Sequence, residues 1–196
     1  MNAESRFITA IDRFDAANAE DPTLETDGDA QVPAQLLYAR RMTARLDAFA
    51  PESPEIVRLA ARSQHICRWK IPRDSYPDGR DGYRRWRTDL GKFHAGLASG
   101  ILRDVGYDQD TIDRVASLLQ KKRLKADPDC QLLEDVICLV FLEHHLDDFA
   151  GQHDEPKLTG ILERTWEKMS EAGREAALKL PLSEAGRTLV AKAVGR

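Results

Sequence analysis

Residues 126–149, "ADPDCQLLEDVICLVFLEHHLDDF", form the most apolar stretch of the chain and decide its fold class. Leu, Val and Ile side chains crowd a segment that is long enough for several helical turns, so we expect a central, buried helix. We find no stretch in which apolar and polar residues alternate as they do in a half-buried strand. The sequence therefore predicts an all-α, single-domain helical bundle over residues 1–196.

Amphipathic segments on both sides of this stretch extend the helical prediction. On the N-terminal side, residues 5–18, 34–49 and 53–66 place apolar side chains at helical spacing, and a polar connector over 20–33 contains Pro and Gly. Ser53 is expected to cap the third of these helices, with Pro54 at its first helical position. Further helices are expected over 83–104, 111–124, 157–170 and 183–194, with Gly106 and Asp110 as a stop and a cap.

The overall composition limits the class of protein. The chain has 196 residues and a formal net charge of -4, which argues against a general nucleic-acid binder. No apolar run reaches the roughly 20 residues of a membrane helix, and residues 1–5 do not resemble a signal peptide. The three cysteines, Cys67, Cys130 and Cys138, form no CxxC pair and suit a reducing compartment. We expect a cytoplasmic protein without a membrane partner, and the sequence leaves its oligomeric state open.

One segment, residues 65–94, carries an excess of positive charge in this acidic chain. It contains eight Lys or Arg residues against four Asp residues. Guanidinium groups bind phosphate or carboxylate oxygens in pairs, and aromatic rings stack on flat ligands, so we expect a small anionic ligand here. The alternative is that these arginines pair with the protein's own acids. The predicted ligand-binding residues are Arg68, Trp69, Arg73, Tyr76, Arg80, Tyr83, Arg84, Trp86 and Arg87.

Two histidines and two acids are the candidates for chemistry. His65 and His94 flank the basic segment, and Glu134 and Asp135 lie side by side on the apolar helix. Imidazole titrates near neutral pH, so His65 and His94, oriented by Asp135, are predicted catalytic residues. The same four side chains, His65, His94, Glu134 and Asp135, are candidate ligands of a divalent metal such as Zn, Mn or Fe. The alternative is that the acids form an ionic clamp with the arginines.

The order of the segments resembles the HD-type phosphohydrolases, which are helical proteins that usually hydrolyse phosphate esters with a bound divalent metal. Residues 93–122, "FHAGLASGILRDVGYDQDTIDRVASLLQKK", resemble the residue pattern of that family. The resemblance implies an HD-like core at about residues 35–150, with C-terminal helices over 157–196 packed on it. The family's metal ligands are replaced, because Gln64-His65 occupies the His-Asp position and Gln120, Lys121 and Lys122 occupy the later His-His position.

A further resemblance covers nearly the whole chain. The motifs "LLYARRMTARL", "LAARSQHICRWKIPRDSYPDGRDGYRRWR", "LGKFHA" and "QLLEDVICLVFLE" are similar to an uncharacterised family, domain of unknown function 4202. That family has no established activity, so this resemblance implies membership of a family without indicating a function.

Three functions follow from these patterns. The first is an HD-like hydrolase of a small phosphorylated compound or nucleotide, with a rebuilt or lost metal site. The second is a non-catalytic module that binds the same anion or nucleotide, which the loss of the usual ligands favours. The third is a structural or interaction protein whose arginine-rich motif is an internal ionic clamp.

Overall fold

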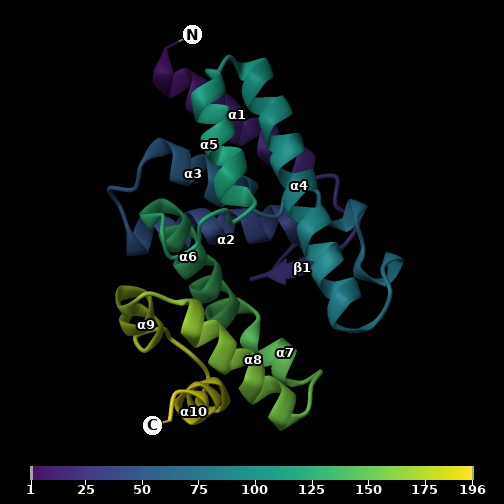
Figure 1. Ribbon diagram of the computed structural model, residues 1–196, viewed down its shortest axis with the longest axis vertical. Coiled ribbons are helices and arrows are strands. Elements are labelled where there is room, and N and C mark those ends of the chain that lie inside the picture. The colour runs from purple at the N-terminus through teal and green to yellow at the C-terminus, as the bar shows by residue number, and fades with distance from the viewer. Residues whose placement is uncertain (1, 196) are drawn as a thin grey trace. The chain divides into compact units, whose positions relative to one another are not determined.

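The computed structural model describes residues 2–195, and most of them lie in helices (Figure 1). The prediction of an all-α protein is confirmed. Backbone contacts divide the chain into two compact units, the first ending at Arg123 and the second beginning at Leu124. Each unit is described by itself below. One domain over 1–196 with an HD-like core at 35–150 stays a prediction.

The first unit is built mainly from five α-helices. The longest, α4, has 27 residues and carries the C-terminal half of the basic segment. Two short 3₁₀ helices precede it, in the stretch between α3 and α4. The elements are α1 (Ala3–Asn18), β1 (Leu24–Asp27), β2 (Ala30–Pro33), α2 (Ala34–Phe49), α3 (Glu55–Ser63), η1 (Arg68–Lys70), η2 (Arg73–Ser75), α4 (Gly79–Val105) and α5 (Gln109–Leu119).

A short β-hairpin lies in the connector between α1 and α2, where no strand alternation was found in the sequence. Strand β1 pairs with β2 in antiparallel register, from Leu24 opposite Pro33 to Asp27 opposite Ala30. Gly28 has a φ of 60°, which is the left-handed conformation that such tight turns require. Most residues of the hairpin are exposed, so neither face imposes an alternating pattern. The Asp-Gly pair at residues 27–28, which is typical of tight turns between two strands, could have predicted this hairpin.

Several helix ends differ from their predicted positions. Helix α3 begins at Glu55, and Pro54 is its cap with an extended ψ of 150°, so Ser53 does not cap the helix. Helix α5 is capped by Asp108, whose carboxylate accepts a hydrogen bond from the Thr111 N–H at 2.8 Å, two residues before the predicted Asp110. The predicted stop of α4 at Gly106 is confirmed by its φ of 89°.

The core of the first unit draws on all five α-helices. Each contributes large side chains that are excluded from solvent, and α4 packs directly against α5. Close packing of these helices fixes the places at which their ends meet. The fully buried side chains include Phe14, Met42, Leu46, Leu59, Leu102, Ile112 and Leu118.

The second unit contains the apolar stretch with which the sequence analysis began. That stretch forms two helices rather than one, because the backbone departs from helical geometry at His145, with φ -127° and ψ -10°. A short helix over 171–177 was not predicted. The elements are α6 (Pro128–His144), α7 (Leu146–Ala150), α8 (Glu155–Lys168), α9 (Glu171–Ala177) and α10 (Glu184–Ala193).

Two general expectations can be compared with the described residues. Within residues 2–195, no helix is both long and apolar enough to cross a bilayer. Cys67, Cys130 and Cys138 are buried thiols.

Candidate functional site: a cationic pocket

A pocket of about 310 Å³ opens in the first unit, where the end of α3, the 3₁₀ helix η1, the middle of α4 and the end of α5 meet. Its size falls in the range of small-molecule sites. Among the described residues, no Asp or Glu side chain lines it. The lining residues are Gln64, His65, Arg68, Arg87, Thr88, Leu90, Gly91, Lys92, His94, Leu119, Gln120, Lys121 and Lys122.

A sharp turn after α3 brings His65 and Arg68 to the pocket. Helix α3 ends at Ser63, and Cys67 adopts the left-handed conformation with a φ of 52°. The Cys67 N–H donates to Oδ1 of buried Asn18 at 3.0 Å, which ties the turn to the end of α1. A non-glycine residue with positive φ is uncommon, so this tie and the surrounding packing must hold it in place.

The ring of His65 is held on two sides. It stacks on Tyr38 with centroids 4.3 Å apart and planes at 15°. Nη1 of Arg68 lies 3.4 Å from Nε2 of His65. A guanidinium has only donors, so Nε2 must be the acceptor, and the ring proton belongs on Nδ1 of a neutral imidazole.

Arg68 is positioned by Trp86 of α4. The guanidinium carbon lies 4.7 Å from the centroid of the indole ring, a cation–π contact, and Trp86 Nε1 donates to the Ile71 carbonyl at 2.9 Å. Burial, together with the neighbouring charge of Arg87, lowers the pKa of Arg68, but a guanidinium stays protonated near neutral pH. Trp86 therefore supports Arg68 from behind rather than lining the pocket itself.

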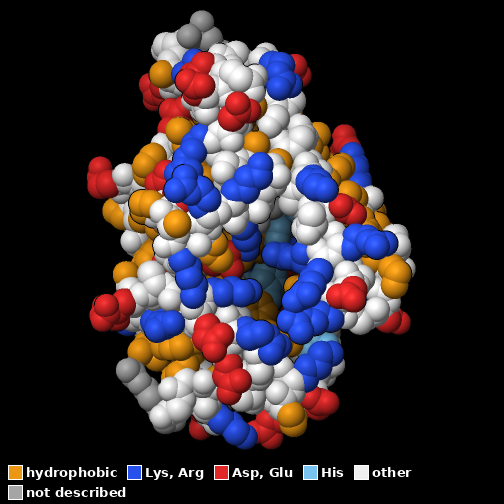
Figure 2. All heavy atoms as spheres, in the orientation of Figure 1, with side chains coloured by type: hydrophobic (Ala, Val, Ile, Leu, Met, Phe, Trp, Pro, Cys, Tyr) orange, Lys and Arg blue, Asp and Glu red, His pale blue; other side chains and the backbone are white. Residues whose placement is uncertain are grey.

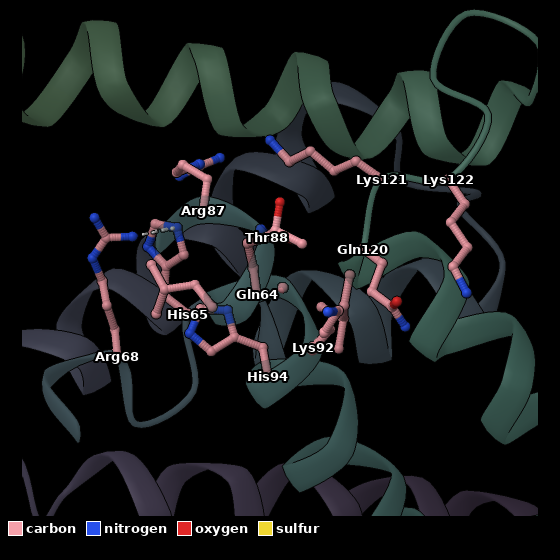
Figure 3. Close-up of a pocket in the computed structure, with 13 residues that line it drawn as sticks. Gln64, His65, Arg68, Arg87, Thr88, Lys92, His94, Gln120, Lys121 and Lys122 are labelled. Atoms are coloured by element: carbon pink, nitrogen blue, oxygen red, sulfur yellow. Dashed lines mark hydrogen bonds between the residues drawn. The ribbon is translucent and has the colours of Figure 1, made fainter. Parts of the chain in front are cut away.

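One face of α4 supplies the floor of the pocket. Arg87, Gly91 and His94 follow at i, i+4 and i+7, so they lie on the same side of the helix. His94 is 3% exposed, and its Nε2 has no hydrogen-bond partner; Oε1 of Gln64, which is 4% exposed, has none either. Figure 3 shows the rings of His65 and His94 next to one another, and their centroids are 5.8 Å apart. Both residues line the pocket, but these two unpartnered atoms are themselves closed off, so water or a ligand would reach them only if the side chains shift.

The turn after α5 closes another side of the pocket. A Cβ atom on Gly91 would lie 3.7 Å from the Cα atom of Gln120, so α4 and this turn run in close contact. Lys121 follows in the left-handed conformation, with a φ of 53°. Lys121 and Lys122 both line the pocket, and Figure 3 shows Lys121 extending toward Arg87.

The pocket is strongly electropositive. It is lined by five cations: Arg68, Arg87, Lys92, Lys121 and Lys122. Burial, together with the charges of Arg68 and Arg87, lowers the pKa of His94 to about 3. Burial and then Arg68 also hold the pKa of His65 well below its ordinary value. Both imidazoles are therefore neutral near pH 7. Figure 2 shows further Lys and Arg side chains gathered over the region that α4 occupies in Figure 1.

Four of the predicted site residues come together at the pocket, namely His65, Arg68, Arg87 and His94. The other predicted ligand-binding residues of the basic segment lie elsewhere in the first unit. Arg73 donates to the carbonyls of Tyr76 and Pro77, which closes the loop before α4, and the Tyr76 hydroxyl donates to Asp89 at 3.1 Å. The remaining predicted ligand-binding residues that do not line the pocket are Trp69, Arg80, Tyr83, Arg84 and Trp86.

Several residues that line the pocket were not predicted from the sequence as site residues. Gln64 is adjacent to His65 in the chain, and Thr88 and Lys92 lie on α4 between Arg87 and His94, so closeness in the sequence was the signal that could have indicated them. Gln120, Lys121 and Lys122 were noticed only as replacements of family ligands, and their approach to α4 depends on the packing of α5.

Glu134 and Asp135 belong to the second unit, and each has partners there. Asp135 is 2% exposed and accepts hydrogen bonds from the Ser170 N–H at 2.8 Å, the Ser170 hydroxyl at 2.5 Å and the Gln131 amide at 3.1 Å. Glu134 lies 4.0 Å from the Lys168 ammonium. Asp135 thereby fastens the residue that caps α9. Its catalytic role, like the clamp between these acids and the arginines, stays a prediction.

The residues of the first unit do not form a metal site by themselves. Arg68, Arg87 and Lys121 surround the two imidazoles and would repel a divalent cation. Over residues 2–195, no group of three or more His, Cys, Asp or Glu side chains is arranged to hold a metal ion. The metal hypothesis, which also requires Glu134 and Asp135 of the second unit, stays a prediction.

These features define a class: an all-α protein whose first unit carries a cationic pocket with two neutral imidazoles. A model of the family described as a domain of unknown function (DUF4202) matches residues 8–190. The chain belongs to that family. Comparison with curated proteins and with solved structures gave no match.

Proposed function

We propose that the protein binds a small phosphorylated compound in this pocket. The observation that carries the proposal is the lining itself, in which five Lys or Arg side chains meet and no carboxylate is present among the described residues. Like charges gathered in a partly buried site repel one another, so an anionic ligand would relieve that repulsion. Guanidinium forks match phosphate oxygens in geometry as well as charge.

The proposal can be tested by thermal unfolding in the presence of phosphate compounds. A ligand that binds only the folded state raises the melting temperature, and the added stability grows with the logarithm of one plus the ratio of its concentration to its Kd. We expect inorganic phosphate and small phosphate esters to raise it, with sodium chloride at equal ionic strength as the control. No rise with any phosphate compound at millimolar concentration would contradict the proposal.

Two arginines on α4 provide a matched pair of variants. Arg87 lines the pocket, whereas Arg84, one turn earlier on the same helix, is exposed and does not line it. Arg87→Ala should abolish most of the stabilisation by phosphate, and Arg84→Ala should retain it. Both variants lose one positive charge, so an equal loss in both would indicate a diffuse charge effect instead of a site.

A second candidate function is hydrolysis of the bound phosphate ester, as the HD-like resemblance implies. Its support is the neutral imidazole of His94, which lines the pocket. A neutral imidazole could take a proton from water as the water oxygen bonds to phosphorus. The ester P–O bond would break, and the proton would pass to the leaving alcohol oxygen. A bound dianion would oppose the charges of Arg68 and Arg87 and raise the pKa of His94 toward the useful range.

Release of inorganic phosphate from small esters would distinguish the enzyme from the binding module. In an enzyme, His94→Gln should lower turnover at least 100-fold and leave binding within about threefold, because the amide cannot carry the proton. Binding without release in the unmodified protein would favour the module.

Metal analysis of protein purified without a histidine tag, followed by assay with added divalent ions, would test the metal hypothesis.

The HD-like relationship has one further line of support. The residues that stand at the family's ligand positions in the sequence resemblance, Gln64-His65 and Gln120 to Lys122, line one pocket together with His94. The resemblance places the family's first ligand in "LLYARRMTARL", where this chain has Arg40 and Arg41 and no His, and these two arginines do not line the pocket. We infer an HD-like site in which cations replace metal ligands, so that the anion would be bound by the protein itself.

A further inference from the structure

The neutral polar groups of the pocket lining indicate what the ligand carries besides phosphate. Thr88 of α4 and Gln120, just after α5, both line the pocket. Figure 3 shows Arg68 at one end, Gln120 toward the other end and Thr88 between them. The part of a ligand that extends from the arginine end therefore meets these two neutral side chains.

Gln120 presents an open hydrogen-bond acceptor to the pocket. Its amide nitrogen donates to the Ala116 carbonyl at 3.1 Å, and this bond fixes the orientation of the amide, because an amide oxygen that faced the carbonyl would be repelled. Among the described residues, the amide oxygen of Gln120 accepts no hydrogen bond and is not buried. It is therefore left to accept a hydrogen bond from a ligand.

Thr88 and Lys122 complete this set of groups. The Thr88 hydroxyl donates to the Arg84 carbonyl at 3.0 Å, so only the lone pairs of its oxygen remain for a ligand. Lys122 is exposed, lies near Gln120 at the end of the pocket opposite Arg68 in Figure 3, and carries an ammonium group with three donors. A ligand hydroxyl both donates and accepts, so it matches the acceptors and the donor together.

The lining offers little to an apolar or aromatic ligand. Among the described residues that line the pocket, none is Phe, Tyr or Trp, and the indole of Trp86 has the guanidinium of Arg68 over it. Leu90 and Leu119 line the pocket but are only 2% and 3% exposed. Bases are usually bound by stacking on an aromatic ring. The lining thus favours a polar, non-aromatic group beside the phosphate.

On the basis of the proposed function, we propose that the ligand is the phosphate monoester of a small polyhydroxyl compound, such as a sugar or polyol phosphate. Arg68 and Arg87 hold the phosphate group, and neither has a carboxylate partner among the described residues. Thr88 and Gln120 accept hydrogen bonds from the hydroxyl groups, and Lys122 donates to them. A pocket of about 310 Å³ is large enough for a ligand of this kind.

A matched pair of esters tests this proposal on the unmodified protein. Glycerol 1-phosphate and propyl phosphate share a three-carbon chain and, at pH 8, the same charge, and they differ by two hydroxyl groups. In calorimetric titration at constant ionic strength, glycerol 1-phosphate should bind at least about fivefold more tightly, because two neutral hydrogen bonds are together worth that factor or more. A smaller preference would overturn the polyhydroxyl ligand.

A second pair of compounds tests the alternative of a nucleotide. AMP and ribose 5-phosphate share the phosphate group and the ribose, and only AMP carries a base. AMP should gain less than about fivefold in affinity over ribose 5-phosphate, because the lining has no aromatic ring on which the base can stack. A larger gain would overturn the proposal, since it would assign the pocket to a nucleotide.

Side-chain variants locate the hydroxyl groups of the ligand. Gln120→Leu removes the acceptor at similar size, and it should lower the preference for glycerol 1-phosphate over propyl phosphate at least about threefold. Thr88→Val, at an exposed position of α4, should do the same without altering the end of α5. Gln109→Leu, at the exposed start of α5 and outside the pocket, is the control and should leave the preference unchanged. A smaller reduction in either pocket variant would overturn the role assigned to that side chain.

The outcomes also distinguish this proposal from the proposed function. Binding of both three-carbon esters without the expected preference would overturn the polyhydroxyl ligand and leave a phosphate site in place. The absence of binding by inorganic phosphate and by both esters at millimolar concentration would overturn both proposals.

Discussion

The imidazole rings of His65 and His94 lie with their centroids 5.8 Å apart and their planes at 45°, inside a pocket lined by cations. Neither ring has a carboxylate among the pocket residues, so nothing in the lining favours the imidazolium form. The pair therefore serves as neutral hydrogen-bonding groups in the empty pocket. This property has consequences for stability and for ligand binding.

The first prediction concerns the effect of acid on stability. A histidine whose folded pKa lies below the unfolded value of about 6.5 binds fewer protons in the folded state, so stability falls as pH falls below about 6.5. His94, with a pKa of about 3, faces the positive groups of Arg68 and Arg87, and His65 behaves in the same direction. His94 should cost roughly 2 kcal/mol of stability between pH 7 and pH 5, and His65 should add to the loss in the same direction.

Urea denaturation of the protein and of His94→Leu at both pH values checks this prediction. The variant should lose ~2 kcal/mol less than the unmodified protein over the same interval, because leucine cannot take up the proton. Equal losses in the two proteins would show that His94 is not the group that acid titrates.

The second prediction concerns the support of Arg68 by Trp86. Trp86→Phe keeps an aromatic face but loses the hydrogen bond from Nε1 to the Ile71 carbonyl, which should cost about 1 kcal/mol. Trp86→Leu also removes the ring beneath the guanidinium and should weaken phosphate binding several-fold more than Trp86→Phe. Titration with inorganic phosphate, together with denaturation, measures both effects. Identical phosphate affinity in the two variants would show that the ring does not position Arg68.

The third prediction compares two glycines of α4. A Cβ atom on Gly82 would fall 1.8 Å from the backbone oxygen of Pro77, whereas one on Gly96 would meet nothing within 4 Å. Gly82→Ala should therefore displace the loop before α4 and destabilise the protein by about 3 kcal/mol or more. Gly96→Ala should stabilise it by about 0.5–1 kcal/mol, the difference in helix propensity. Thermal denaturation distinguishes them. A Gly82→Ala variant that is as stable as the unmodified protein, or more stable, would refute the close approach at Pro77.

The fourth prediction concerns Asp135 in the second unit. Asp135→Ala removes an acceptor of three hydrogen bonds and leaves the Ser170 donors buried, so it should destabilise the protein by about 3 kcal/mol. Gln131→Ala removes one of the three donors and should cost about 1 kcal/mol. Denaturation measures both. If a turnover is found, its loss in Asp135→Ala without loss of stability would instead assign Asp135 to the chemistry.

Much of the helical structure followed from local pattern. The segment 34–49 was predicted as a helix and has those bounds, because apolar spacing and flanking prolines act over a few residues. The end of α4 at Gly106 was predictable for the same reason, since only the local backbone requires a positive φ there. The caps at Pro54 and Asp108 differ by a residue or two from the predicted ones, since neighbouring polar residues compete for the same backbone donors.

The sequence by itself determined the helical class, the family motifs and the presence of excess positive charge around His65 and His94. Only the tertiary structure decided which cations share a pocket. Arg84 and Arg87 look equivalent in the sequence and lie one turn apart on the same side of α4, but only Arg87 lines the pocket, because the pocket does not extend to the turn that carries Arg84. Lys121 and Lys122 stand about 30 residues from His94 along the chain and reach the pocket because α5 packs on α4 at Gly91. Local spacing fixes the face of a helix on which a residue lies, whereas the packing of distant helices fixes what that face meets.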